Sequence, residues 1–198
     1  MKQPKEIFLA TTNQGKVEEI QKFLQEFDVK IITGDYPDVE ETGHSFADNA
    51  IIKAKACAEF SGLPTLADDS GLCIWTLGGS PGIFSKRWIG PNKSYPDAFK
   101  KIEEELQRAE GRNRLASFIC SLVYCFPGKK TMPYKVFEGR VDGEIIFPAR
   151  GSNNFGYDPI FVPEGHDKTF AEMTRQEKLE ISHRSLALQK FSKDILVA

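Results

Sequence analysis

The chain has 198 residues, of which 40% are hydrophobic and 27% charged, and its formal net charge at pH 7 is −2. A chain of this length buries roughly 70% of its unfolded surface and needs no covalent staples. The slight acidic excess argues against a general nucleic-acid or membrane-surface binder, since such proteins carry a surplus of lysine and arginine. No apolar run approaches the ~18 residues of a membrane span, and the first apolar run is too short for a signal peptide. We therefore expect a cytoplasmic protein that binds neither nucleic acid nor membrane.

Cysteine usage also bears on the compartment. The four cysteines stand singly inside apolar segments, with no C-x-x-C pair and no histidine at metal-ligand spacing. This pattern predicts small, reduced core residues rather than a disulfide, a zinc site or a nucleophile. It agrees with a reducing compartment.

The first third of the chain alternates strand and helix patterns. The apolar run 7–10 predicts a buried strand, and the polar loop 11–16 leads into a helical spacing of apolar residues up to Phe27. A second strand is expected over 29–33. Ser45, with Asp48 three residues later, is typical of a helix start.

Later segments add further strands. We expect a short strand over 63–67 that ends in the acidic sequence Asp68-Asp69-Ser70-Gly71. The remaining expected elements are a helix over 94–107, a strand over 114–126, strands over 135–140 and 144–147 joined by a turn at 141–143, a strand over 159–162, a capping box at 174–177 and a terminal helix containing residues 186, 191 and 195. This order favours an α/β fold with a mixed sheet and helices on both sides.

The loop after the first strand is a candidate phosphate site. A polar turn with glycine at a helix N-terminus offers backbone N–H groups and the positive end of the helix dipole, both of which favour phosphate. Thr11 and Asn13 add donors, and Lys16 adds a positive charge at the start of the helix. The spacing is not that of a Walker loop, and an ordinary strand-to-helix turn is the alternative.

Two acidic pairs are candidate metal ligands. Asp68 and Asp69 follow an apolar strand, and adjacent carboxylates there need solvent or a hard cation such as Mg²⁺. Because successive strand residues point to opposite faces, the two aspartates are expected to differ in role. Glu40 and Glu41 form the second pair, and for both pairs a solvated acidic turn is the alternative.

Three further features stand out. Lys53 lies among small apolar residues of the second expected helix, where a surface lysine is the usual interpretation. The segment 151–158 contains Phe155 and Tyr157 beside glycine, so its rings could stack on a planar base or fill the core. A His183-Arg184 pair at the start of the last helix is electrostatically unfavourable without a nearby anion or acceptor.

Six stretches together resemble the inosine triphosphate pyrophosphatase family, whose bacterial members act on dITP and XTP. They are LATTNQGK, EETGHSFADNAIIKA, LADDSGL, LGGSPGIFSKR, FGYDPIFVP and EKLEISHRSLAL, and they occur in the family's order over nearly the whole chain. The resemblance implies a single domain over residues 1–198 with two lobes on an elongated, twisted mixed sheet. It further implies a nucleotide cleft between the lobes and a homodimeric assembly.

The resemblance also assigns site residues. Asp69 would be the catalytic proton acceptor and, with Glu41, a ligand of the Mg²⁺ cofactor; Glu40 stays an alternative to Glu41, and the role of Asp68 stays open. Phe155 would stack on the base, and four residues would surround the base edge. The implied substrate-binding residues are Thr11, Thr12, Asn13, Gln14, Gly15, Lys16, Lys53, Ser70, Phe155, Gly156, Tyr157, Asp158, Lys178, His183 and Arg184.

The implied activity is hydrolysis of non-standard purine nucleoside triphosphates (ITP, dITP and XTP) to the monophosphate and pyrophosphate. Arg184 would accept a 6-oxo purine by donating to it, whereas the 6-amino group of adenine would present a second donor. Two alternatives remain at this point: a Maf-like pyrophosphatase for modified or pyrimidine nucleotides, and a catalytically silent nucleotide-binding protein on the same fold.

Overall fold

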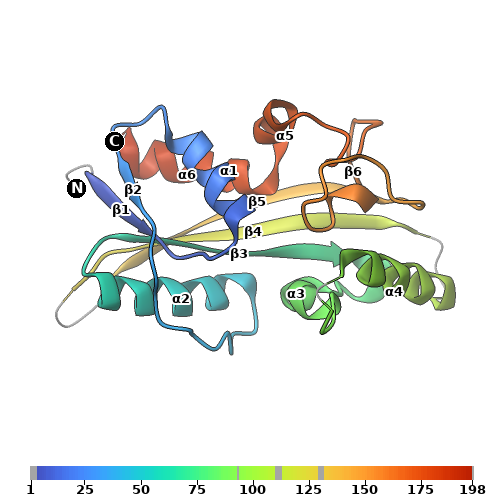
Figure 1. The fold of residues 1–198 in the computed structure, drawn as a ribbon, viewed down its shortest axis with the longest axis horizontal. Helices are drawn as coiled ribbons and strands as arrows, with labels where there is room; N and C mark the ends of the chain where they lie inside the picture. Colours follow the sequence, from blue (N-terminus) through green and yellow to red (C-terminus); the bar gives the residue numbers. More distant parts are fainter. Residues whose placement is uncertain (1–3, 93, 110–112, 129–131, 198) are drawn as a thin grey trace. The chain divides into compact units, whose positions relative to one another are not determined.

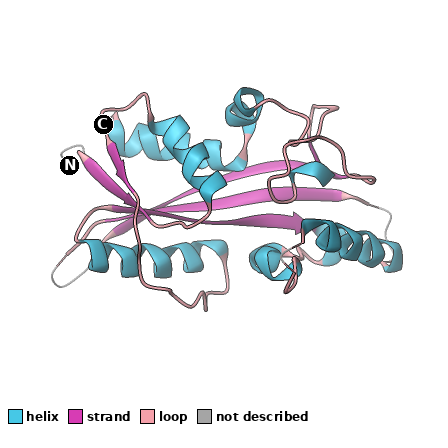
Figure 2. Cartoon of the chain, viewed as in Figure 1, coloured by secondary structure: helices cyan, strands magenta, loops and turns pink. Residues whose placement is uncertain are grey.

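The structure is a computed structural model in which residues 4–92, 94–109, 113–128 and 132–197 are described (Figure 1). The strands are β1 (Glu6–Leu9), β2 (Lys30–Ile32), β3 (Thr65–Ile74), β4 (Leu115–Cys125), β5 (Tyr134–Ile145) and β6 (Phe161–Pro163). The helices are α1 (Gln14–Leu24), α2 (Phe46–Ser61), α3 (Ser85–Trp88), α4 (Tyr95–Arg108), α5 (Arg175–Ile181) and α6 (His183–Phe191). Figure 2 distinguishes the helices from the strands by colour.

One six-stranded sheet has the order β2-β1-β3-β4-β5-β6. β1 pairs in parallel with β2 and β3, whereas β5 and β6 are antiparallel. Parallel neighbours at one edge and an antiparallel pair at the other make the sheet mixed, so the predicted α/β class with a mixed sheet is confirmed.

The chain forms two compact units. Unit 1 comprises residues 1–69, 120–139 and 183–198, and unit 2 comprises residues 70–119 and 140–182. β3, β4 and β5 each contribute residues to both units. The boundary in β3 falls directly after Asp69, so the two adjacent aspartates belong to unit 1.

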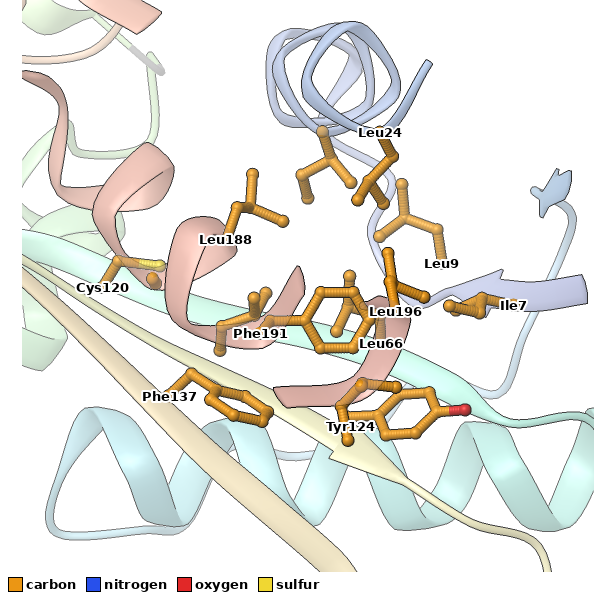
Figure 3. Close-up of a cluster of buried hydrophobic side chains, with 14 residues drawn as sticks. Ile7, Leu9, Leu24, Leu66, Cys120, Tyr124, Phe137, Leu188, Phe191 and Leu196 are labelled. Atoms are coloured by element: carbon orange, nitrogen blue, oxygen red, sulfur yellow. The ribbon is translucent and has the colours of Figure 1, made fainter. Parts of the chain in front are cut away.

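Unit 1 has helices on both faces of its strands. α1 and α6 lie on one face, and α2 lies on the other (Figure 1). On the α1 and α6 face, Leu24, Leu188 and Phe191 pack with strand residues such as Leu66 and Tyr124 (Figure 3). The α2 face is built from small side chains and a few larger ones, namely Ala50, Ala54, Cys57, Ala58, Phe8, Ala67 and Val123. Small residues let α2 approach the sheet closely.

Unit 2 has an aromatic core. The ring of Phe118 on β4 lies 4.7 Å from that of Phe161 on β6, and Phe161 lies 5.4 Å from Phe170. α4 adds Ala98 and Ile102 to the same core. Burying rings of this size contributes much of the stability of a small unit.

The predicted helix starts are confirmed. The Ser45 side chain accepts from the Asp48 N–H at 3.1 Å, and the Ser94 side chain accepts from the Asp97 N–H at 3.3 Å. Thr174 and Glu177 form a reciprocal capping box at the start of α5. These caps satisfy N–H groups that have no partner inside the helix.

Two strand predictions were wrong. β3 does not end at residue 67 but continues through Asp68 and Asp69 to Ile74. The expected turn at 141–143 is also absent, because β5 runs without interruption from Tyr134 to Ile145. Gly143 serves a different purpose there: a Cβ at this position would lie 3.0 Å from the Cα of Pro163, so glycine allows β6 to approach.

None of the described helices is both long enough and apolar enough to cross a membrane.

Candidate functional site

The loop between β1 and α1 has the local structure of an anion site. Asn13 is the N-cap of α1, and its side chain accepts from the Lys16 N–H at 3.2 Å. The Asn13 N–H in turn donates to the Thr11 hydroxyl at 3.2 Å. Thr12, Asn13 and Gln14 are exposed, whereas Gly15 and Lys16 are half-buried. A capped helix N-terminus with exposed polar residues favours a negatively charged ligand.

Lys16 takes part in a network of two cations and two carboxylates, of which Arg184 and Asp68 are buried. The Lys16 ammonium is 2.9 Å from Asp68 Oδ2. Nε and an NH₂ group of Arg184 each lie 3.3 Å from the same oxygen, and the other NH₂ group of Arg184 pairs with Glu19. Arg184, although at the start of α6, is therefore compensated by carboxylates from β3 and α1. These partners supply the anions that its position at the positive end of a helix requires.

The ion pairs of this network keep Asp68 and Arg184 in their charged forms. Burial by itself would raise the pKa of Asp68, but Lys16, Arg184 and Lys53 lower that pKa well below the ordinary value of an aspartate. Burial would likewise lower the pKa of Arg184, yet Glu19 and Asp68 raise it. Asp68 is thus ionised and pairs with two cations, Lys16 and Arg184.

Asp69 has different neighbours. Its Oδ2 accepts from the Asn49 side-chain amide at 3.2 Å, and Asn49 belongs to α2. Asp68 and Asp69 therefore contact helices on opposite faces of the strand, as the alternation of a strand predicts. Burial raises the pKa of Asp69, and Lys16 and Lys53 oppose that rise. An aspartate with a raised pKa among cations is a candidate proton acceptor.

Lys53 connects this carboxylate group with the segment before α2. Its ammonium lies 2.7 Å from Glu41 Oε1 and donates to the backbone carbonyl of Asp68 at 3.1 Å. Burial would lower the pKa of Lys53, but Asp68 and Glu41 raise it. Glu41 is half-buried, whereas Glu40 is exposed. Of the two glutamates, the geometry favours Glu41 as the functional one.

The carboxylates of this site can be compared with the oxygen ligands that Mg²⁺ prefers. Among the described residues, no three His, Cys, Asp or Glu side chains form a ready cage for a metal. Mg²⁺, however, is usually bound by one or two carboxylates together with phosphate oxygens of the substrate. Glu41 and Asp69 both offer hard oxygen ligands, and Lys53, which pairs with Glu41, also donates to the backbone carbonyl of Asp68, the residue before Asp69. The residues present fit a magnesium ion that is completed by a nucleotide.

In unit 2, the predicted base-side residues form a second group. The Lys178 ammonium lies 2.6 Å from Asp158 Oδ2 and 4.6 Å from the centre of the Phe155 ring. Tyr157 is only 4% exposed, and its hydroxyl donates to the Ser85 carbonyl at 2.7 Å. Of the two rings in segment 151–158, Tyr157 fills the core while Phe155 stays half-buried. Gly156 between them has a φ of +62°, which glycine adopts without strain.

A hollow of about 670 Å³ lies in unit 2, and the side chains just described do not line it. Trp75, Arg140, Asp142 and Arg150 are among its lining residues, and the Arg140 guanidinium lies 5.0 Å from the centre of the Trp75 ring. None of the expected site residues lines this hollow. It therefore gives no support to any of the expected site assignments.

The structure brings most of the expected residues of each unit together. In unit 1, Lys16, Asp68 and Arg184 share one network, and Lys53 joins Glu41; His183 is buried beside Arg184 in the chain. Ser70 is the first residue of unit 2 and follows Asp69 in β3.

Two functional candidates were missed from the sequence, Glu19 and Asn49. Asn49 could have been detected from the sequence, because it is a polar residue on the apolar face of its helix.

Comparison with known proteins bears on this site. A sequence model of the Ham1 family matches residues 7–194. The chain belongs to the Ham1 family. A dITP/XTP pyrophosphatase of Caulobacter vibrioides is 48% identical over 184 residues, which cover 91% of this chain and 93% of that protein. A dITP/XTP pyrophosphatase of Bacillus subtilis is 45% identical over 193 residues, with 96% of each chain covered.

Solved structures of the Ham1 family have the same fold. A Ham1 protein from Coxiella burnetii superposes with a TM-score of 0.89 at 42% identity, covering 98% of this chain and 99% of the other. A nucleoside-triphosphatase, also described as a dITP/XTP pyrophosphatase, from Mycobacterium abscessus gives a TM-score of 0.74 at 37% identity, with 94% and 98% coverage. The family expected from the six sequence motifs is confirmed.

Proposed function

We propose that this chain hydrolyses non-standard purine nucleoside triphosphates (ITP, dITP and XTP) to the nucleoside monophosphate and pyrophosphate, and so cleanses the nucleotide pool. The observation that supports this most strongly is the near-full-length similarity to dITP/XTP pyrophosphatases. The side chains agree with it, because Lys16, at the capped N-terminus of α1, pairs with the buried Asp68, and Lys53 pairs with Glu41. A pyrophosphate-release assay with dITP tests it.

The triphosphate binds to residues of unit 1. The loop Thr11–Gly15 donates to phosphate oxygens from side chains and from the N–H groups at the start of α1. Lys16 and Lys53 contribute positive charge, and their carboxylate partners Asp68 and Glu41 hold both ammonium groups in place. Cations held in fixed positions stabilise the charge that develops on the leaving pyrophosphate. Ser70, next to Asp69, contacts the substrate.

Asp69 acts as the proton acceptor. The oxygen of a water molecule forms a bond to the α-phosphorus, the bond from that phosphorus to the bridging oxygen breaks, and pyrophosphate leaves. The proton of the water passes to Asp69, a carboxylate whose pKa is raised by burial. The Asn49 amide donates to this carboxylate at 3.2 Å.

Nucleotide pyrophosphatases generally use a divalent metal, and we propose Mg²⁺ here, held by Glu41 and Asp69. When bound, Mg²⁺ would neutralise phosphate charge and polarise the phosphate oxygens. Lys53 already pairs with Glu41, so this glutamate is held in position by a cation in the protein itself.

For the base, the proposal keeps the residues that the family resemblance assigns. We propose that Phe155 stacks on the purine, with Gly156 giving the ring space, and that Tyr157 supports the loop from within the core. The family resemblance assigns contacts with the base edge to Asp158, Lys178, His183 and Arg184. A donor from Arg184 to a 6-oxo group would favour ITP and XTP, because the 6-amino group of ATP would leave polar groups unpaired at a cost of ~1–3 kcal/mol each.

We further propose that the protein is a cytoplasmic homodimer. All four cysteines are buried free thiols, which suits a reducing compartment. The dimer rests on the family resemblance alone.

Lys16→Ala is expected to weaken binding of a non-hydrolysable ITP analogue about ten- to a hundredfold while changing the affinity for inosine little. The reason is that Lys16 is assigned to phosphate only, and a charge-assisted hydrogen bond contributes ~1.5–3 kcal/mol. Calorimetric titration measures both affinities. Lys22→Ala, which removes an exposed charge from the same helix, is the control. Equal losses for the two ligands would assign Lys16 to the base instead.

Phe155→Ala should have the opposite pattern, weakening inosine and ITP by the same factor of about five- to a hundredfold. Stacking of a base on an aromatic ring contributes ~1–3 kcal/mol and does not depend on the phosphates. Phe60→Ala, which removes a ring that is 59% exposed on α2, is the matched control. Unchanged inosine binding in Phe155→Ala would contradict the stacking role.

A further inference from the structure

Asn49 is an unusual residue for its place on α2. It is 2% exposed and lies on the buried face of a helix otherwise lined by Phe46, Ala50, Ala54 and Cys57. A buried amide is costly unless both its donor and its acceptor are satisfied. A polar side chain at this position therefore calls for a specific pair of partners.

Both partners of the Asn49 amide are present in unit 1. The amide nitrogen donates to Asp69 Oδ2 at 3.2 Å, and the amide oxygen accepts from the Gly43 N–H at 2.8 Å. A carboxylate can only accept and a backbone N–H can only donate, so these two partners fix which way the amide points. One side chain thus links the reacting carboxylate with the backbone two residues after Glu41.

The approach of Gly43 to Asn49 is close. A Cβ on residue 43 would lie 2.7 Å from Asn49 Oδ1, 2.8 Å from Asn49 N and 2.5 Å from Asp48 Cβ. Such distances are shorter than side-chain contacts allow, so only glycine fits here. The segment that carries Glu41 is consequently held against the first turn of α2 at the residue that also contacts Asp69.

We propose that Asn49 is a positioning residue, which sets the orientation of Asp69 and its distance from Glu41 so that the two carboxylates are arranged for one cation and one water molecule. The inference rests on the proposed function, because it takes Asp69 and Glu41 as the acidic pair. Residues that orient metal ligands through a hydrogen bond affect metal affinity or activity about 10- to 100-fold when they are changed.

The test compares Asn49→Ala with the wild-type chain in four measurements. The value of kcat for dITP should fall about 10- to 100-fold, and the Mg²⁺ concentration at half-maximal rate should rise by a similar factor. The affinity for Mn²⁺, titrated by calorimetry in the presence of α,β-methylene ITP, should fall likewise. The affinity for α,β-methylene ITP in EDTA should change by less than about threefold, because the phosphate and base contacts are intact.

Asn49→Asp separates the two hydrogen bonds of the amide. The new carboxylate still accepts from the Gly43 N–H, but it offers no donor to Asp69 and adds a like charge beside it. We expect kcat at least as low as in Asn49→Ala. An Asn49→Asp protein with the wild-type kcat would show that Asn49 matters only through its hydrogen bond with the Gly43 N–H. That result would overturn the proposal.

Asp48→Ala is the matched control. Asp48 is the neighbouring residue, and its carboxylate accepts from the His44 N–H at 3.3 Å, so its loss releases the same segment without touching Asp69. Its kcat and half-maximal Mg²⁺ concentration should stay within about threefold of the wild type. If Asp48→Ala and Asn49→Ala lose the same factor, or if Asn49→Ala lowers only the melting temperature, the positioning role is wrong.

Failure of this inference and failure of the proposed function give different results. If Asn49→Ala retains the wild-type kcat while Asp69→Asn is inactive, the positioning role fails and the function stands. If the wild-type chain releases no pyrophosphate from dITP, the function fails whatever Asn49 does.

Discussion

Asp69→Asn is expected to reduce kcat for dITP by about a thousandfold or more while leaving the affinity for α,β-methylene ITP in EDTA within about threefold. The change removes the charge and the proton-accepting oxygen but keeps the shape of the side chain. Single-turnover kinetics and calorimetry measure the two quantities. A kcat near that of the wild type at saturating Mg²⁺ would remove Asp69 from the reaction.

Asp68→Asn serves as the matched comparison, since it makes the same chemical change one residue away. Asp68 is fully buried and is the shared partner of Lys16 and Arg184, so its loss leaves two cations poorly compensated. Breaking a buried ion pair by removing one partner costs about 3–5 kcal/mol. We expect a marked loss of melting temperature for Asp68→Asn and little for Asp69→Asn. Equal effects of both variants on kcat and on stability would contradict this division of roles.

Arg184→Ala is expected to have two separable effects. The first is a loss of about 3–5 kcal/mol of unfolding free energy, because Asp68 and Glu19 lose a buried partner. The second is a fall of the ITP/ATP ratio of kcat/KM by about ten- to a hundredfold, because one charged donor to the 6-oxo group disappears. Chemical denaturation measures the first effect, and a substrate comparison well below the melting temperature measures the second.

Arg184→Lys tests whether the planar guanidinium is needed for both effects. Lysine keeps the positive charge but loses the planar fork that contacts Asp68 through two nitrogens, so it should rescue only part of the stability and part of the selectivity. A folded Arg184→Ala protein with an unchanged ITP/ATP ratio would remove base recognition from Arg184. An unchanged unfolding free energy would contradict the buried network.

The fold was predictable where local rules decide it. Ser45, Ser94 and Thr174 each begin a helix, and the side chain of each accepts a hydrogen bond from the N–H three residues later. This spacing of residue types can be recognised in the sequence alone. The opposite environments of Asp68 and Asp69 followed from the alternation of a strand.

The two strand errors have different causes. β3 is buried along almost its whole length, so it shows no alternation of apolar and polar residues, and its acidic residues look like a loop. They can lie in the strand because Lys16, Arg184 and Asn49 compensate them, and these residues come from α1, α6 and α2. At Gly143 the reason for glycine is the approach of β6, which local sequence does not reveal.

The two residues that the sequence analysis missed, Glu19 and Asn49, each contact a partner on another element. Glu19 contacts Arg184 from a position 165 residues earlier in the chain, and no spacing rule connects them. Asn49 was detectable as a polar residue on an apolar helix face, but its partner Asp69 was not. Spacing identifies residues that share an element, whereas the partner on another element depends on the tertiary fold.

The most direct test of the proposed function is the measurement of pyrophosphate release from ITP, dITP, XTP, GTP and ATP, with Mg²⁺ and with EDTA. We expect one pyrophosphate and one nucleoside monophosphate per turnover from ITP, dITP and XTP, with kcat/KM at least about tenfold above that for ATP and GTP, and loss of turnover in EDTA. Release of inorganic phosphate with a nucleoside diphosphate, equal rates for all five nucleotides, or no turnover of dITP in Mg²⁺ would contradict the account.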